Sequence, residues 1–154
     1  MKLLVVCLGN ICRSPLAEGA LASRIAASPL AGRVQVDSAG TADWHAGRPP
    51  DPRAIACARG HGVDISGLRA RQIRDSDYVE FDWLLCADPQ NLRDVLARAP
   101  ANTRDKVVLL MDWTGVQAGG AVPDPYTGGE EEFEHAWRLV DSAAQAVVGR
   151  LCAS

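Results

Sequence analysis

Cys7 and Arg13 lie six positions apart, at the two ends of a short loop whose residue types suit chemistry on a tetrahedral oxyanion. The loop contains Gly9 and Asn10, two residue types that tolerate left-handed backbone angles well. A loop curled in this way points successive backbone N–H groups inward as an anion cradle, which favours the thiolate form of a cysteine at its edge. Arg13 can fold back and bind two oxygens of the same anion. These groups together predict attack of sulfur on phosphorus; a buried strand-end cysteine and a surface arginine are the alternative.

A carboxyl group is the second candidate. Asp124 stands between Pro123 and Pro125, and flanking prolines stiffen a loop and restrict where the carboxyl group points. Transfer of a phosphoryl group to sulfur leaves an oxyanion that needs a proton, which a carboxylic acid outside the cradle could supply. Because an Asp-Pro pair is also an ordinary turn signal, spacing alone leaves Asp124 as either a catalytic acid or a turn residue.

Short apolar runs alternate with helical patterns along the chain. The expected strands cover residues 3–6, 34–36, 83–86 and 106–111. One helix is expected to start at Ser14, which can cap it with Pro15 at the first helical position; further helices are expected over 52–61, over 89–98 and from Glu130 onwards. This alternation predicts an α/β domain with a parallel sheet, in which ligands bind beyond the carboxyl ends of the strands. The cradle follows the first strand at such an end.

The composition limits the class of protein. The 154 residues suit one domain, which we place at 1–154, with 47% hydrophobic and 23% charged residues. A net charge of −3 and a pI of about 5.6 argue against nucleic acid or an anionic membrane as a partner. Five cysteines, an odd number, argue against a disulfide scaffold, and no apolar run suits a spanning helix or a signal peptide. We therefore expect a soluble, cytoplasmic protein, and no His, Cys and carboxylate spacing predicts a metal or cofactor.

A family resemblance rests first on the loop, which reads Cys7-Leu8-Gly9-Asn10-Ile11-Cys12-Arg13-Ser14-Pro15 and looks like the phosphate loop of the low molecular weight protein tyrosine phosphatases. Other segments resemble the family in the family's own order: residues 37–41, 43–45, 47–48, 51–54, 61–62, 69–72, 82, 85–88, 91–94 and 124–126. The resemblance covers nearly the whole chain. It implies a three-layer α/β/α fold, flavodoxin-like and doubly wound, with a central four-stranded parallel sheet.

The resemblance also implies a role for each loop residue. Cys7 is expected to be the nucleophile that forms a phosphocysteine intermediate, and Asp124 to be the general acid that later activates water. Arg13 and the loop amides are expected to bind the phosphate oxygens in the transition state. Ser14 is expected to donate a hydrogen bond from its hydroxyl to the thiolate, which keeps the thiolate ionised, a plain helix cap being its alternative. The remaining phosphate-binding and supporting residues are Leu8, Gly9, Asn10, Ile11, Cys12 and Ser38.

Two of the eight aromatic residues, Trp44 and Tyr126, fall in expected loops instead of on apolar faces. They match family positions that wall a slot for a phenol ring, on which Ile11 is expected to press. Anchoring of these loops on the core is the alternative.

The five cysteines divide into two groups. Cys12 lies five residues from Cys7, so the pair is expected to form a reversible disulfide on oxidation, a small buried apolar residue being the alternative for Cys12. Cys57, Cys86 and Cys152 fall on helical or strand faces and are expected in the core, with partial exposure of Cys152 near the C-terminus.

The chain departs from many bacterial relatives at two positions. Leu68 stands where they carry a histidine that braces the cradle asparagine and a serine, here Asn10 and Ser38, so the sequence leaves open how this loop is braced. Thr127 stands where many members have a second tyrosine, which leaves Tyr126 as the sole tyrosine there for phosphorylation.

Three other functions stay open. Protein-arginine phosphatases share the loop but typically carry threonine at the position of Ile11. An arsenate reductase needs further relay cysteines, and Cys57 and Cys86 do not form a close pair in sequence. A non-catalytic phosphate-binding or redox-sensing module would lack Asp124. The favoured interpretation is metal-independent hydrolysis of phosphotyrosine in proteins. Its partners would be tyrosine-phosphorylated proteins and a cognate bacterial tyrosine kinase, and the expected state is a monomer, with a weak dimer as the alternative.

Overall fold

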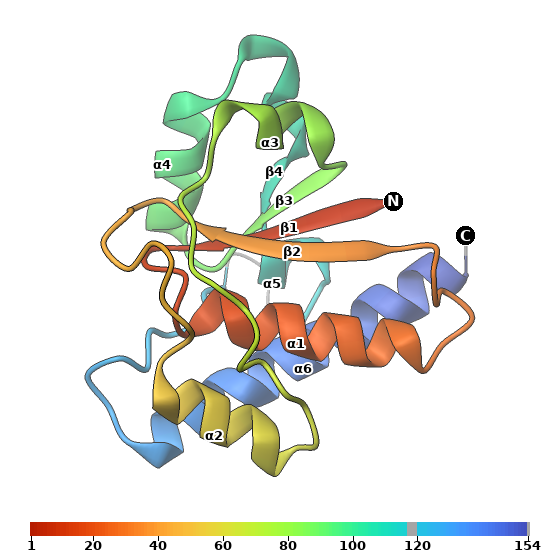
Figure 1. The fold of residues 1–154 in the computed structure, drawn as a ribbon. Helices are drawn as coiled ribbons and strands as arrows, with labels where there is room; N and C mark the ends of the chain where they lie inside the picture. The colour runs from red at the N-terminus through yellow and green to blue at the C-terminus, as the bar shows by residue number, and fades with distance from the viewer. Residues whose placement is uncertain (117–119, 154) are drawn as a thin grey trace.

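Strands and helices alternate along the computed structural model, which describes residues 1–116 and 120–153 (Figure 1). The strands are β1 (Lys2–Cys7), β2 (Gln35–Gly40), β3 (Trp83–Cys86) and β4 (Val107–Leu109). The helices are α1 (Arg13–Ala26), α2 (Pro52–Gly60), α3 (Asp75–Glu80), α4 (Pro89–Arg98), the 3-10 helix η1 (Ala101–Lys106), α5 (Leu110–Trp113) and α6 (Glu130–Cys152).

The four strands form one parallel sheet with the order β2-β1-β3-β4. Because β1 lies between β2 and β3, the strand order reverses beside it. The carboxyl end of β1 is therefore a topological switch point, the place where ligands bind in open α/β sheets. The predicted four-stranded parallel sheet is confirmed, and the loop that carries the candidate chemistry begins at this switch point.

A helical layer covers each face of the sheet. Alternate β1 residues belong to different cores: Leu3 and Val5 pack with α1 and α6, and Leu4 and Val6 pack with α3 and α4. Figure 1 shows α3 and α4 on one side of the sheet and α1, α2 and α6 on the other. This three-layer α/β/α arrangement is the predicted flavodoxin-like fold, in which helices pack on both faces of β1.

Several predicted boundaries were wrong. The fourth strand was expected to reach residue 111, but Leu110 and Met111 are buried in the short helix α5. A continuous apolar run does not distinguish a buried strand from a buried helix, which explains the error. The second strand extends to Gly40 instead of ending at residue 36. Helix α3 was not predicted, because its six residues are mostly polar; the buried Tyr78 anchors it by donating a hydrogen bond to the Val95 carbonyl at 2.7 Å.

Within residues 1–116 and 120–153, no helix is long and apolar enough to cross a membrane.

Candidate active site

The candidate site begins at Cys7, the last residue of β1, whose side chain is buried. The Cys7 sulfur accepts a hydrogen bond from the backbone N–H of Asn10 at 3.3 Å and lies 2.9 Å from the Ser14 hydroxyl. Of the two loop residues that tolerate left-handed backbone angles, Asn10 adopts one, with φ 57°, and Gly9 does not. Its small size has a different use, because a Cβ at Gly9 would lie 3.1 Å from the His45 ring.

Ser14 does not cap the helix. Helix α1 begins at Arg13 with Cys12 as its N-cap and no side-chain cap, which places Ser14 inside the first turn. The Ser14 hydroxyl accepts a hydrogen bond from the Asn10 amide nitrogen at 2.8 Å. A hydroxyl has one proton, and the Asn10 contact leaves that proton free to point at the Cys7 sulfur. The geometry therefore favours a hydroxyl that stabilises a thiolate over the helix-cap alternative.

The side chain of Asn10 braces the cradle through three hydrogen bonds. Its side-chain amide nitrogen also donates to the Ser38 hydroxyl at 2.9 Å, and its carbonyl oxygen accepts from the backbone N–H of Arg71 at 3.0 Å. The Ser38 hydroxyl donates in turn to Glu18 at 2.6 Å. Leu68, at the position of the family's histidine, packs against the core instead. Glu18 therefore braces Ser38 in this chain, and the sequence interpretation missed it.

Glu18 is unusual because it places a carboxyl group on the largely buried helix α1. Burial raises the pKa of Glu18 to about 7; the hydrogen bond from Ser38 opposes this rise and the negative charge of Asp37 adds to it. Near neutral pH the carboxyl group is therefore partly protonated. Glu18 is the one charged residue between Leu16 and Ala22, and this was the one sequence signal that could have identified it.

Arg13 is buried and fixed by groups distant in the chain. Its Nη1 donates to an Asp88 carboxylate oxygen at 2.6 Å and to the Val122 carbonyl at 3.1 Å, and its Nη2 lies 3.9 Å from Asp124. Burial alone would lower the pKa of Arg13, but the Asp88 hydrogen bond and the neighbouring negative charges hold the pKa above its ordinary value. Asp88 also accepts from the backbone N–H of Asn91 at the start of α4, so it is itself held in place. Asp88 was not predicted as a site residue.

A pocket of about 210 Å³ opens over the cradle. It is lined by Cys7, Leu8, Gly9, Ile11, Cys12, Arg13, Trp44, His45, Asp124 and Tyr126. Trp44 is 69% exposed and Tyr126 is 49% exposed, so neither serves chiefly to anchor a loop on the core. An Asp124 carboxylate oxygen accepts from the backbone N–H of Tyr126 at 3.1 Å, which orients that carboxyl group at the pocket. The structure thus brings together the predicted residues of the cradle, the acid and the slot, and adds His45.

Comparison with known proteins decides the family. A family model described as "Low molecular weight phosphotyrosine protein phosphatase" matches residues 2–153. The chain belongs to this family. It is 40% identical to the low molecular weight phosphotyrosine protein phosphatase of Sus scrofa over 135 residues, which cover 86% of this chain and 84% of that protein.

Solved structures agree with this assignment. A protein tyrosine phosphatase from Entamoeba histolytica superposes with a TM-score of 0.93 and 33% identity, over 99% of this chain and 97% of that one. Vibrio vulnificus Wzb, solved in complex with benzylphosphonate, superposes with a TM-score of 0.85 and 33% identity, over 97% of both chains.

The second cysteine of the phosphatase loop differs from the first. Cys12 is buried, and burial, followed by the negative charge of Asp51, raises its pKa to about 12. Cys12 therefore stays a protonated thiol near neutral pH. Both are free in this structure, and the Cys7–Cys12 disulfide stays a prediction.

The other three cysteines were expected in the core, and they differ in how far they are buried. Cys86 is buried, Cys57 is half-buried and Cys152 is exposed. Cys86 therefore lies in the core as expected and Cys57 does so in part, whereas Cys152, near the end of α6, is more exposed than the partial exposure expected.

Proposed function

We propose that this phosphatase hydrolyses phosphotyrosine in proteins through a phosphocysteine intermediate on Cys7. One observation carries the proposal: the Cys7 sulfur faces a hydroxyl and a backbone N–H at the foot of a pocket onto which Arg13 and Asp124 also face. These are the groups that a two-step phosphoryl transfer to sulfur requires.

In the first step, the substrate phosphate enters the cradle and the Cys7 thiolate attacks phosphorus. The bond from phosphorus to the tyrosine oxygen breaks, and Asp124 gives its proton to that oxygen. Arg13 and the loop N–H groups bind the phosphate oxygens as negative charge shifts between them. In the second step, Asp124 takes a proton from water, the water oxygen attacks phosphorus, and the Cys7 thiolate leaves with stabilisation from the Ser14 hydroxyl. The products are tyrosine and inorganic phosphate, and the enzyme returns to its starting state.

The pocket walls support an aromatic substrate. Trp44 and Tyr126 are exposed aromatic side chains on loops, and Ile11 adds an apolar surface beside the cradle. A phenol ring would lie between these side chains, with its phosphate on the cradle. Ile11 offers no hydroxyl to orient water near a phosphoramidate, so we place phosphoarginine second as a substrate.

The proposal extends to the surroundings of the enzyme. Its partners would be tyrosine-phosphorylated proteins, with a bacterial tyrosine kinase as the opposing enzyme, and it would act as a monomer. Buried free thiols at Cys7, Cys12 and Cys86 suit the reducing cytoplasm. A reversible Cys7–Cys12 disulfide would protect the nucleophile during oxidation.

The test is hydrolysis of p-nitrophenyl phosphate and of matched phosphotyrosine, phosphoserine and phosphoarginine peptides, with a chelator present. We expect preference for phosphotyrosine, no turnover by Cys7→Ser, and a decrease in kcat of about 10²-fold or more for Asp124→Asn. Full activity of Cys7→Ser would refute the mechanism, and preference for phosphoarginine would refute the substrate class.

A further inference from the structure

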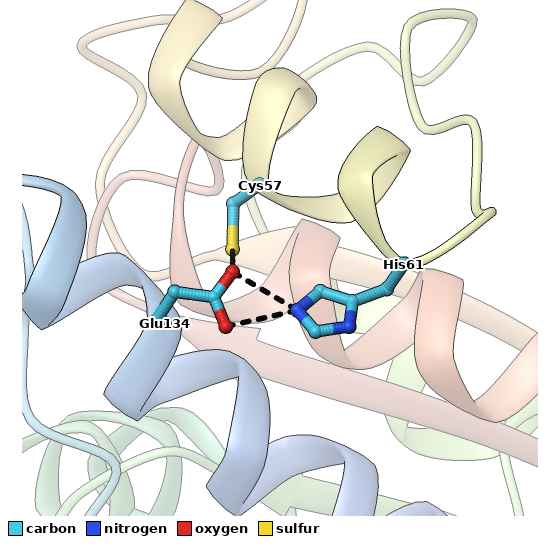
Figure 2. Close-up of side chains that lie close together, drawn as sticks. All are labelled: Cys57, His61 and Glu134. Atoms are coloured by element: carbon cyan, nitrogen blue, oxygen red, sulfur yellow. Dashed lines mark hydrogen bonds and ion pairs between the residues drawn. The ribbon is translucent and has the colours of Figure 1, made fainter.

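Helices α2 and α6 meet at a cluster of three side chains that takes no part in the proposed reaction (Figure 2). Cys57 lies on α2, His61 is the C-cap of α2, and Glu134 lies on α6. The Cys57 sulfur is 3.5 Å from a Glu134 carboxylate oxygen, and His61 Nε2 is 2.9 Å from both oxygens of that carboxylate. The sulfur, the ring nitrogen and a carboxylate oxygen all lie within 4.8 Å of one another.

We propose that Cys57, His61 and Glu134 form a binding site for Zn²⁺. A thiolate, an imidazole and a carboxylate are the three ligand types that zinc takes in proteins, and three protein ligands leave a fourth, open position for water. The sulfur ligand disfavours Mg²⁺ and Ca²⁺, which prefer oxygen. Among the residues that the structure describes, this is the one group of His, Cys and acidic side chains close enough to hold an ion.

The local fold holds these ligands in register. Cys57 and His61 are four residues apart, so one face of α2 presents both to α6. The His61 ring stacks on Trp137, with ring centroids 4.9 Å apart and an interplanar angle of 12°, which fixes the plane of the imidazole. Three donor atoms gathered on two packed helices need small side-chain shifts to reach zinc-binding distances of about 2.0–2.3 Å.

An ion can reach the cluster from solvent. A pocket of about 260 Å³ is lined by Cys57 and Glu134 together with Arg53, Phe133 and other residues of α2 and α6. The side chains of His61 and Glu134 are 36% and 40% exposed. None of the three cluster residues lines the pocket over Cys7, so an ion here would leave the catalytic pocket open.

Binding requires a defined exchange of protons. Burial and the nearby Glu134 carboxylate raise the pKa of Cys57 to about 12, so the metal-free thiol keeps its proton. Zn²⁺ would replace that proton, which leaves to solvent, and would bind the resulting thiolate. His61 must offer the Nε2 lone pair to the ion, so its ring proton must then reside on Nδ1. No electron transfer is involved.

The test is titration of the full chain with Co²⁺, whose bond to a thiolate gives a strong absorption band, followed by displacement with Zn²⁺ against a chromogenic chelator. We expect one equivalent to bind to wild type and to Cys7→Ser, and Mg²⁺ not to compete. Each of the substitutions Cys57→Ser, His61→Gln and Glu134→Gln should weaken binding at least about tenfold, because each removes a direct ligand.

Matched controls change the same kinds of side chain elsewhere: the exposed thiol of Cys152 in Cys152→Ser, the exposed imidazole of His135 in His135→Gln, and an α4 carboxyl group in Asp94→Asn. All three should bind like wild type. If Cys57→Ser does not fold by circular dichroism, His61→Gln decides the question. Absence of a one-equivalent thiolate band in wild type, its survival in the folded Cys57 or His61 variant, or its loss in Cys7→Ser would overturn the proposal.

Discussion

Replacing Glu18 by glutamine should change how the stability of the phosphatase depends on pH. In the folded chain the pKa of the Glu18 carboxyl group rises from its ordinary value of 4.5 to about 7, mainly because the side chain is partly buried. A raised pKa means that folding favours the protonated form. The contribution of Glu18 to the free energy of unfolding is therefore complete below about pH 4.5 and decreases as the pH rises from there to about 7. Above that pH the free energy of unfolding no longer changes through Glu18.

The size of the effect follows from the same change in pKa. At about 1.4 kcal/mol per pH unit, a rise from 4.5 to about 7 gives at most about 3 kcal/mol, and partial solvent access reduces it. Glutamine keeps an oxygen that can accept the Ser38 hydrogen bond but does not ionise. Relative to wild type, Glu18→Gln should therefore gain between about 1 and 3 kcal/mol in unfolding free energy from pH 4.5 to pH 8.

The assay is urea unfolding followed by tryptophan fluorescence at several pH values, with linear extrapolation to water. Glu131→Gln, at an exposed carboxyl group in the first turn of α6, is the matched control and should follow wild type at every pH. Parallel curves for wild type and Glu18→Gln would refute a partly buried Glu18 with a raised pKa.

Three further predictions concern the groups around the cradle. A Cβ at Gly40 would lie 2.7 Å from the Leu8 carbonyl, so Gly40→Ala should displace the cradle and lower kcat about tenfold or more while circular dichroism stays native. Ser14→Ala removes the hydroxyl that faces Cys7 and should lower kcat about 10²-fold, with a lower KM as well, because slower breakdown of the phosphocysteine lowers both. Asp88→Asn weakens the charge partner of Arg13 and should cost about 1–3 kcal/mol in urea unfolding and raise KM. Wild-type kinetics in any of these variants would contradict the corresponding contact.

Local sequence patterns predicted those elements of the phosphatase that are determined by residues contiguous in the chain. The three-and-four apolar spacing after Glu130 identified α6, and the short apolar run at residues 83–86 identified β3 with its observed bounds. The cradle was also predictable, because its strand, turn and helix start are contiguous in the chain.

The features that the sequence did not predict depend mostly on contacts between segments distant in the chain. Asp88 lies 75 residues from its partner Arg13, and Glu18 lies 20 residues from its partner Ser38. No spacing rule links such pairs. His61 and Glu134 are 73 residues apart for the same reason, so their cluster with Cys57 was not predicted. The boundary between β4 and α5 was not predicted, because the apolar, buried residues run on from the strand into the helix.

The most direct test of the central claim is to look for phosphate on Cys7 during turnover. Wild-type and Ser14→Ala proteins would be mixed with p-nitrophenyl phosphate, quenched rapidly in acid, digested and analysed by mass spectrometry. We predict one added phosphoryl group on the peptide that contains Cys7, more of it in Ser14→Ala because thiolate departure is slowed, and none in Cys7→Ser. A phosphoryl group on a different residue, or turnover with the Cys7 peptide never modified, would contradict the account.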